Sequence, residues 1–113
     1  MDDMRNKIIC RYSDERALYA AYMPFISDGG LFITTADEYK LGSNIVMRLQ
    51  LLDEPEVLEV AGKVVWITPK GAQAGRPSGV GIQLQGKNKR YVRNKIETYL
   101  TGMLNSNQPT DTI

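Results

Sequence analysis

Few residues in this chain could do chemistry, and histidine is missing from its 113 residues. Histidine is the commonest general base and metal ligand, so neither a Ser–His nor a Cys–His nucleophile pair can form. The single cysteine, Cys10, follows two isoleucines, a position typical of a small buried hydrophobe, and it permits no intramolecular disulfide. We therefore expect that the chain is not an enzyme and that it binds neither a metal ion nor a cofactor.

Three short segments have some features of functional motifs. Residues 76–79 contain a serine but lack the preceding glycine of a nucleophile elbow. Residues 79–81 begin like a dinucleotide fingerprint, yet they have no third glycine and lie in a strand pattern. The acidic residues in 53–56 surround a proline and indicate a hairpin turn. A hydrolase that uses only carboxylates remains open, but no pattern supports it.

The composition is that of one ordinary globular domain covering residues 1–113. Apolar residues make up 42%, charged residues 24%, and the formal net charge is +1, so no global field favours nucleic acid or anionic membrane. No apolar run approaches the roughly 18 residues of a membrane-spanning helix, and the acidic N-terminus is unlike a signal peptide. We expect a cytoplasmic protein without membrane insertion.

The elements that must position any site are mostly strands. Alternating or β-rich patterns predict strands over 7–12, 31–35, 45–51, 57–68 and 80–84. The glycine at Ala61-Gly62 predicts a bulge or bend in the long strand. Turns between the strands favour an antiparallel sheet that closes into a small barrel over about 7–86.

Two helices complete the expected fold. Ser13, as a capping hydroxyl, and the acids after it predict a short helix over 16–22, which Pro24 stops. Apolar residues at helical spacing predict an amphipathic helix over 88–104, packed across one opening of the barrel. The remaining residues, 105–113, form a polar tail.

Several segments together resemble the PilZ-domain family, and within it the members that act in type IV pilus assembly. The resemblance lies in residues 61–75 (AGKVVWITPKGAQAG), 79–83 (GVGIQ), 22–25 (YMPF) with the glycine pair 29–30, and 94–98 (NKIET). No one of these motifs is diagnostic, but their order and spacing are. The resemblance implies a small β-barrel with a C-terminal helix.

Many PilZ domains bind cyclic di-GMP through an RxxxR arm and a [D/N]xSxxG turn. Here the turn carries Phe25 at its first position and keeps only Ser27 and Gly30, while Arg11 and Arg16 have the wrong spacing for the arm. Each lost charge-assisted bond is worth about 1.5–3 kcal/mol. We expect no physiological affinity for cyclic di-GMP; the alternative is a cyclic-di-GMP receptor with an unconventional site.

The resemblance to the pilus-assembly members implies a monomeric, non-catalytic adaptor in pilus biogenesis and twitching motility. Its expected partners are the pilus extension ATPase (PilB-type) and, in some bacteria, a degenerate EAL-domain protein (FimX-type) that senses cyclic di-GMP. A small-barrel nucleic-acid binder is a third possibility. Because its strands carry few aromatic and basic pairs, we expect no nucleic-acid partner.

Protein partners bind exposed aromatic and apolar anchors with a polar rim. One candidate group surrounds Pro24: Tyr22, Met23 and Phe25, with Tyr19 nearby. A second group ends the long strand, at Trp66, Ile67 and Pro69, and the last expected helix with its tail forms a third surface. Each aromatic ring could instead belong to the core. Our hypothesis places Tyr22 and Trp66 on one ATPase-binding face, where alanine at either position removes binding and leaves thermal unfolding nearly unchanged.

A basic run opens the last expected helix and contains Lys87, Lys89, Arg90, Arg93 and Lys95. Cations at a helix N-terminus oppose the macrodipole, so their placement has a small stability cost. A solvated helix face, an acidic partner or nucleic acid would each account for them.

Overall fold

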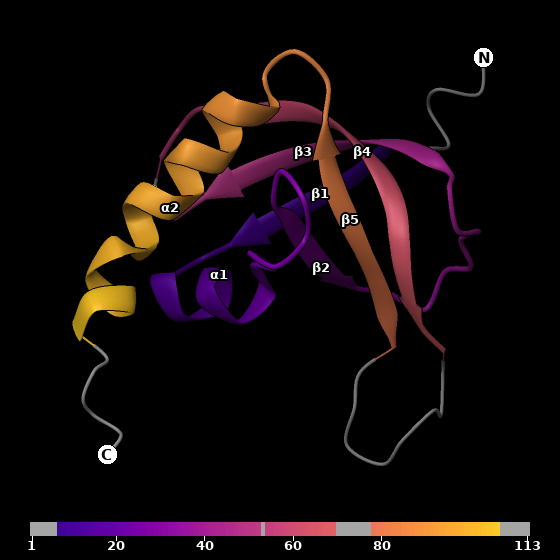
Figure 1. The fold of residues 1–113 in the computed structure, drawn as a ribbon, viewed down its shortest axis with the longest axis horizontal. Coiled ribbons are helices and arrows are strands. Elements are labelled where there is room, and N and C mark those ends of the chain that lie inside the picture. Colours follow the sequence, from indigo (N-terminus) through magenta and orange to yellow (C-terminus); the bar gives the residue numbers. More distant parts are fainter. Residues whose placement is uncertain (1–6, 53, 70–77, 107–113) are drawn as a thin grey trace.

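The structure, a computed structural model, describes residues 7–52, 54–69 and 78–106. The elements are β1 (Lys7–Tyr12), α1 (Glu15–Ala21), β2 (Gly30–Thr34), β3 (Asn44–Leu51), β4 (Val57–Thr68), β5 (Gly79–Gln85) and α2 (Lys89–Ser106) (Figure 1). All five expected strands and both expected helices are confirmed, with bounds within two residues. The loop expected around 69–79 and the tail lie largely outside the described residues.

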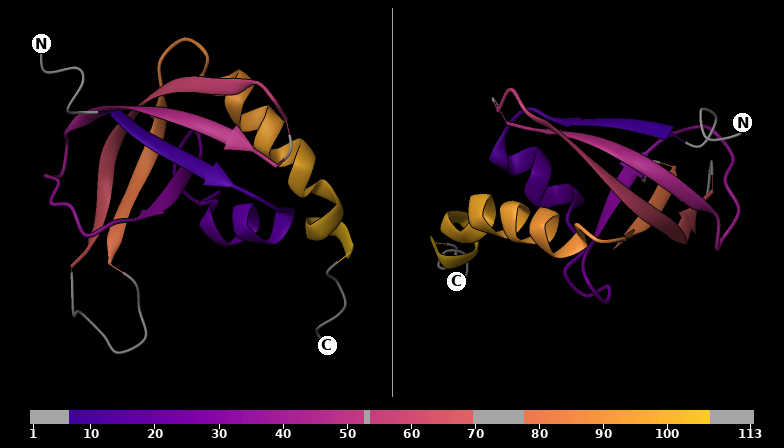
Figure 2. Two further views of the ribbon diagram at one scale, coloured as in Figure 1. Left: turned by 180° about the vertical axis from the view of Figure 1, so that it is seen from behind. Right: turned by 90° about the horizontal axis from the view of Figure 1, so that it is seen from above.

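The strands form one curled sheet in the order β1-β3-β4-β5-β2, a half-barrel with β1 and β2 at its two edges (Figures 1 and 2). The expectation of a mainly β fold with a C-terminal helix is confirmed. The expectation of a closed, wholly antiparallel sheet is wrong, because β1 runs parallel to β3. Between these two strands the chain makes α1 and β2, a crossover long enough to permit parallel pairing.

The core lies on the concave side of the sheet. Alternate residues of β3 from Ile45 to Leu51 are buried there, as the period-2 pattern requires. α2 contributes Val92, Ile96 and Leu100, one helical turn apart and all fully buried, and packs against α1, β4 and β5. Each such side chain stabilises the fold by about 1.5–3 kcal/mol. From Val92 to Leu100, α2 is therefore fixed to α1 and to the sheet.

Two local details differ from expectation. The cap of α1 is Asp14 and not Ser13: its Oδ1 accepts a hydrogen bond from the backbone N of Ala17 at 2.8 Å. The bulge expected at Gly62 lies instead between Val64 and Trp66, and Gly62 itself is in regular pairing with Ile45 and Leu84. Its lack of a side chain serves packing, because a Cβ at Gly62 would lie 2.4 Å from Cγ2 of Ile82.

Candidate protein-binding groove

A β-bulge in β4 decides where Trp66 lies. Val64 pairs with Ile82, but Trp66 already pairs with Gly81, so Val65 is one extra residue on this strand. In a regular strand, Trp66 would pair with Val80, and the alternation that buries Val60 and Val64 would turn the indole into the core. Because of the bulge, Trp66 is on the outer face of the sheet, with 51% of its surface exposed.

The segment that follows α1 lies against the same outer face. The backbone N of Met23 donates to the carbonyl of Gly30 at 2.8 Å, which ties the segment to β2. The side chain of Met23 then lies over Gly81: a Cβ at Gly81 would be 3.1 Å from its Sδ and 2.9 Å from Cβ of Trp66. Gly81 therefore lets the two segments meet on β5.

Together these elements form an open groove of about 400 Å³, which we call the aromatic groove. It is lined by Ala20, Tyr22, Met23, Phe25, Phe32, Trp66 and Thr68. Phe25 is 77% exposed at its rim, and the indole Nε1 of Trp66 donates to Oγ1 of Thr68 at 2.9 Å, which orients the ring. The groove thus presents exposed aromatic side chains that a partner could cover, and the Trp66 ring among them has a fixed orientation.

Four of the six residues expected to bind protein line this groove, namely Tyr22, Met23, Phe25 and Trp66. Pro24 is exposed beside them, and Pro69 lines a separate hollow with Ile67 and Thr68. Sequence reasoning missed Gly81 and Phe32. A glycine in the middle of a strand and an aromatic residue between two buried neighbours were the available signals.

The surface position expected for Tyr22 is wrong. Its side chain is only 8% exposed, and its hydroxyl donates to Oε2 of Glu97 on α2 at 2.5 Å. Burial, together with the neighbouring Glu97 carboxylate, raises the pKa of the Tyr22 phenol to about 12. Tyr22 forms the inner wall of the aromatic groove and joins it to α2.

The turn that carries Ser27 and Gly30 is docked on β5 and α2. The carbonyl of Ser27 accepts from Nε2 of Gln83 at 2.9 Å, and the carbonyl of Gly29 accepts from the backbone N of Leu84 at 3.0 Å. Gly30 packs so closely that a Cβ there would lie 2.8 Å from the carbonyl oxygen of Ile82. The polar backbone of this turn is therefore largely used within the fold.

Three of the five cations in the basic run pair with acidic side chains of the same chain. Nζ of Lys89 lies 3.0 Å from Asp28, Nε of Arg93 lies 3.4 Å from Glu97, and Nζ of Lys95 lies 2.8 Å from Glu54. The first and third pairs join α2 to the turn at 28 and to the hairpin at 54, while Arg93–Glu97 lies within α2. Hydrogen bonds from Lys95 and Tyr99 hold the pKa of Glu54 below its usual range. This arrangement favours a bracing helix face over a nucleic-acid site.

The described residues contain neither a cluster of metal ligands nor a membrane-spanning helix. Within residues 7–52, 54–69 and 78–106, no three His, Cys, Asp or Glu side chains gather so as to hold a metal ion. No helix in this part of the chain is long and apolar enough to cross a membrane.

The geometry defines a small half-barrel binding domain with an aromatic groove on its outer face. The sequence profile of the PilZ domain matches residues 4–102, and the chain belongs to the PilZ-domain family. These are cyclic-di-GMP-binding or adaptor-type domains and are generally non-catalytic. Comparison with curated proteins gives no match.

Proposed function

We propose that this chain is a non-catalytic cytoplasmic adaptor of type IV pilus biogenesis and twitching motility, which binds the pilus extension ATPase through the aromatic groove. One observation supports this most directly: Trp66 and Phe25, from distant parts of the sequence, are exposed side by side in one groove. Tryptophan and aromatic neighbours in a pocket are the residues that most often carry protein–protein affinity.

The neighbouring turn favours the adaptor role over nucleotide binding. At the position where a cyclic-di-GMP turn has Asp or Asn, Phe25 presents an apolar ring to solvent. Arg11 directs its Nε to Oε1 of Gln50 at 3.1 Å, on the adjacent strand β3. Without a guanine-reading side chain or an arginine arm, a nucleotide would lose several charge-assisted contacts of about 1.5–3 kcal/mol each.

The binding test uses the full chain and the purified ATPase in a titration followed by calorimetry. Trp66→Ala and Phe25→Ala should each weaken binding by at least about tenfold, the effect expected of a central anchor. Tyr91→Ala is the matched control, because Tyr91 is also 51% exposed but lies on α2 outside the groove. Equal affinities for all three variants and wild type would show that the groove is not the binding face.

Two further titrations separate the partners. Cyclic di-GMP added to the chain alone should give no heat at micromolar concentration, whereas micromolar binding would favour the receptor with an unconventional site. A degenerate EAL-domain protein, if it is the third member, should bind the chain together with the ATPase. Loss of the ATPase on its addition would instead indicate competition for one face.

A further inference from the structure

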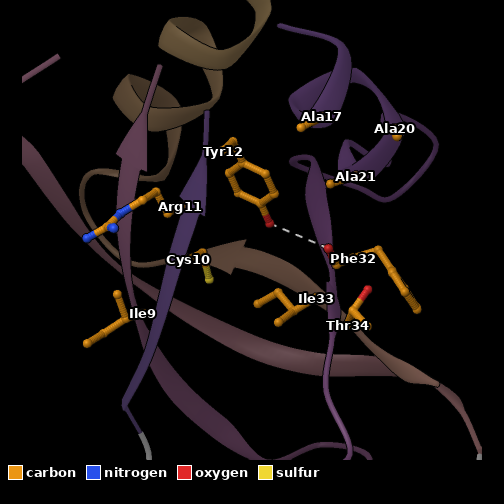
Figure 3. A pocket seen from close by; sticks show the side chains of 10 residues that line it. All are labelled: Ile9, Cys10, Arg11, Tyr12, Ala17, Ala20, Ala21, Phe32, Ile33 and Thr34. Atoms are coloured by element: carbon orange, nitrogen blue, oxygen red, sulfur yellow. Dashed lines mark hydrogen bonds between the residues drawn. The ribbon is translucent and has the colours of Figure 1, made fainter. Parts of the chain in front are cut away.

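The two edges of the half-barrel face each other across a cleft of about 430 Å³, which we call the seam (Figure 3). β1 forms one side and β2 the other, and small residues of α1, namely Ala17, Ala20 and Ala21, line one end. Cys10 and Ile33 point toward each other inside, while the Arg11 side chain extends from β1 on the side away from β2 (Figure 3). The seam therefore gives access to two strand edges at once.

Backbone hydrogen bonds show which groups of β1 face the seam. The carbonyl of Tyr12 accepts from the backbone N of Leu52 at 2.8 Å, so the peptide groups of Tyr12 are directed toward the β3 side. Successive residues of a strand direct their N–H and C=O groups to alternate sides. The groups of Ile9 and Arg11 therefore point into the seam.

The same reasoning applies to β2. The carbonyl of Gly30 accepts from Met23 on the side away from β5, and the carbonyl of Phe32 accepts from the hydroxyl of Tyr12 across the seam at 3.5 Å. By alternation, Gly30, Phe32 and Thr34 direct their N–H and C=O groups to this edge, and the antiparallel bridge between Tyr22 and Leu31 already pairs its first part, up to the N–H of Phe32. In residues 7–52, 54–69 and 78–106, no strand pairs with the groups of Thr34 on this edge.

We propose that the seam binds an extended strand of a partner protein that carries an acidic side chain opposite Arg11. An extended backbone supplies the alternating donors and acceptors that two facing edges require, which a helix does not. The bond from Tyr12 to Phe32 is long for a hydroxyl donor, so an incoming N–H can replace it with a shorter one.

The charge of the seam fixes the preferred sequence of that strand. Arg11 is the one charged residue that lines it, and its Nε binds the neutral amide of Gln50. An acidic side chain on the occupant would compensate this cation, whereas a basic one would be repelled. The seam shares Ala20 and Phe32 with the aromatic groove, so the two sites adjoin, but Trp66 does not line the seam.

The test uses the full chain and end-capped peptides of about eight residues that alternate valine and threonine around a central aspartate, lysine or serine. NMR-detected hydrogen exchange is measured with and without peptide. The aspartate peptide should slow exchange of the Thr34 amide, while those of Leu31 and Ile33, already directed to β5, stay unchanged.

Charge-reversal variants then test the recognition. Arg11→Glu should weaken the affinity for the aspartate peptide by at least about tenfold and should increase the affinity for the lysine peptide. Lys87→Glu, the same charge change at an exposed position outside the seam, should bind like wild type. Trp66→Ala should also bind the peptide normally, which separates the seam from the proposed ATPase-binding groove.

Three results would overturn the proposal. The first is that none of the peptides binds, and the second is that binding leaves exchange at Thr34 unchanged or is insensitive to Arg11→Glu. The third is protection of the Thr34 amide that rises with protein concentration in the absence of peptide, because this would assign the seam to a second copy of the chain.

Discussion

Replacing Tyr22 tests whether this residue belongs to the core or to a binding face. Tyr22→Ala removes a ring that is only 8% exposed, and such truncations cost about 3–5 kcal/mol. Tyr22→Phe keeps the ring and removes only the hydrogen bond to Glu97, worth about 1.5–3 kcal/mol because the acceptor is charged. Trp66→Ala should cost less than Tyr22→Ala, since half of the indole already faces water.

Urea unfolding followed by far-ultraviolet circular dichroism measures these differences from the shift of the midpoint at constant slope. The expected order of stability is wild type, Tyr22→Phe, Tyr22→Ala. A loss below about 1 kcal/mol for Tyr22→Ala, or a larger loss for Trp66→Ala, would refute the assignment of Tyr22 to the core. In that case, weaker binding of the Tyr22→Ala variant to the ATPase would assign Tyr22 to the binding face.

The same contact has a pH signature. The pKa of the Tyr22 phenol is raised from 10.0 to about 12 in the fold. A raised pKa adds stability that is fully present below pH 10 and is lost as the pH rises through about 12. Burial also raises the pKa values of Tyr12 and Tyr39, so an ultraviolet titration of phenolate should show several tyrosines that ionise late. Tyr22→Phe should reduce the amplitude of this late phase by one tyrosine.

Three further outcomes are expected. Gly62→Ala should destabilise the fold by about 1–3 kcal/mol in urea unfolding, because the new Cβ would overlap Ile82. Near neutral pH, the wild type should be thermally more stable than Glu54→Gln, because only the ionised carboxylate pairs with Lys95. This difference in stability should disappear as the pH falls through the lowered pKa of Glu54 and the carboxylate becomes protonated. Burial raises the pKa of the Cys10 thiol to about 12, so a thiol reagent at neutral pH should modify it only after unfolding.

The local elements could be predicted because their signals are contained in short stretches of sequence. The alternation of apolar and polar residues in 45–51 correctly predicted β3, and the helical spacing of apolar residues in 88–104 correctly predicted α2. A strand buries one face with a period of two residues and a helix with a period of 3.6. The exposed aromatic residues of the groove could be identified from the sequence, but their positions relative to one another could not. Tyr22 and Trp66 were each ambiguous, because an aromatic ring suits a core as well as an interface.

The sequence by itself determined the type and order of the elements, the lack of histidine chemistry and the apolar ring of Phe25 in the turn. Only the tertiary structure decided that β1 runs parallel to β3, which leaves two edges facing across the seam. It also decided, through the one-residue bulge before Trp66, which aromatic residue faces solvent. Pairing direction and register depend on contacts between residues far apart in the chain, and no local pattern records them.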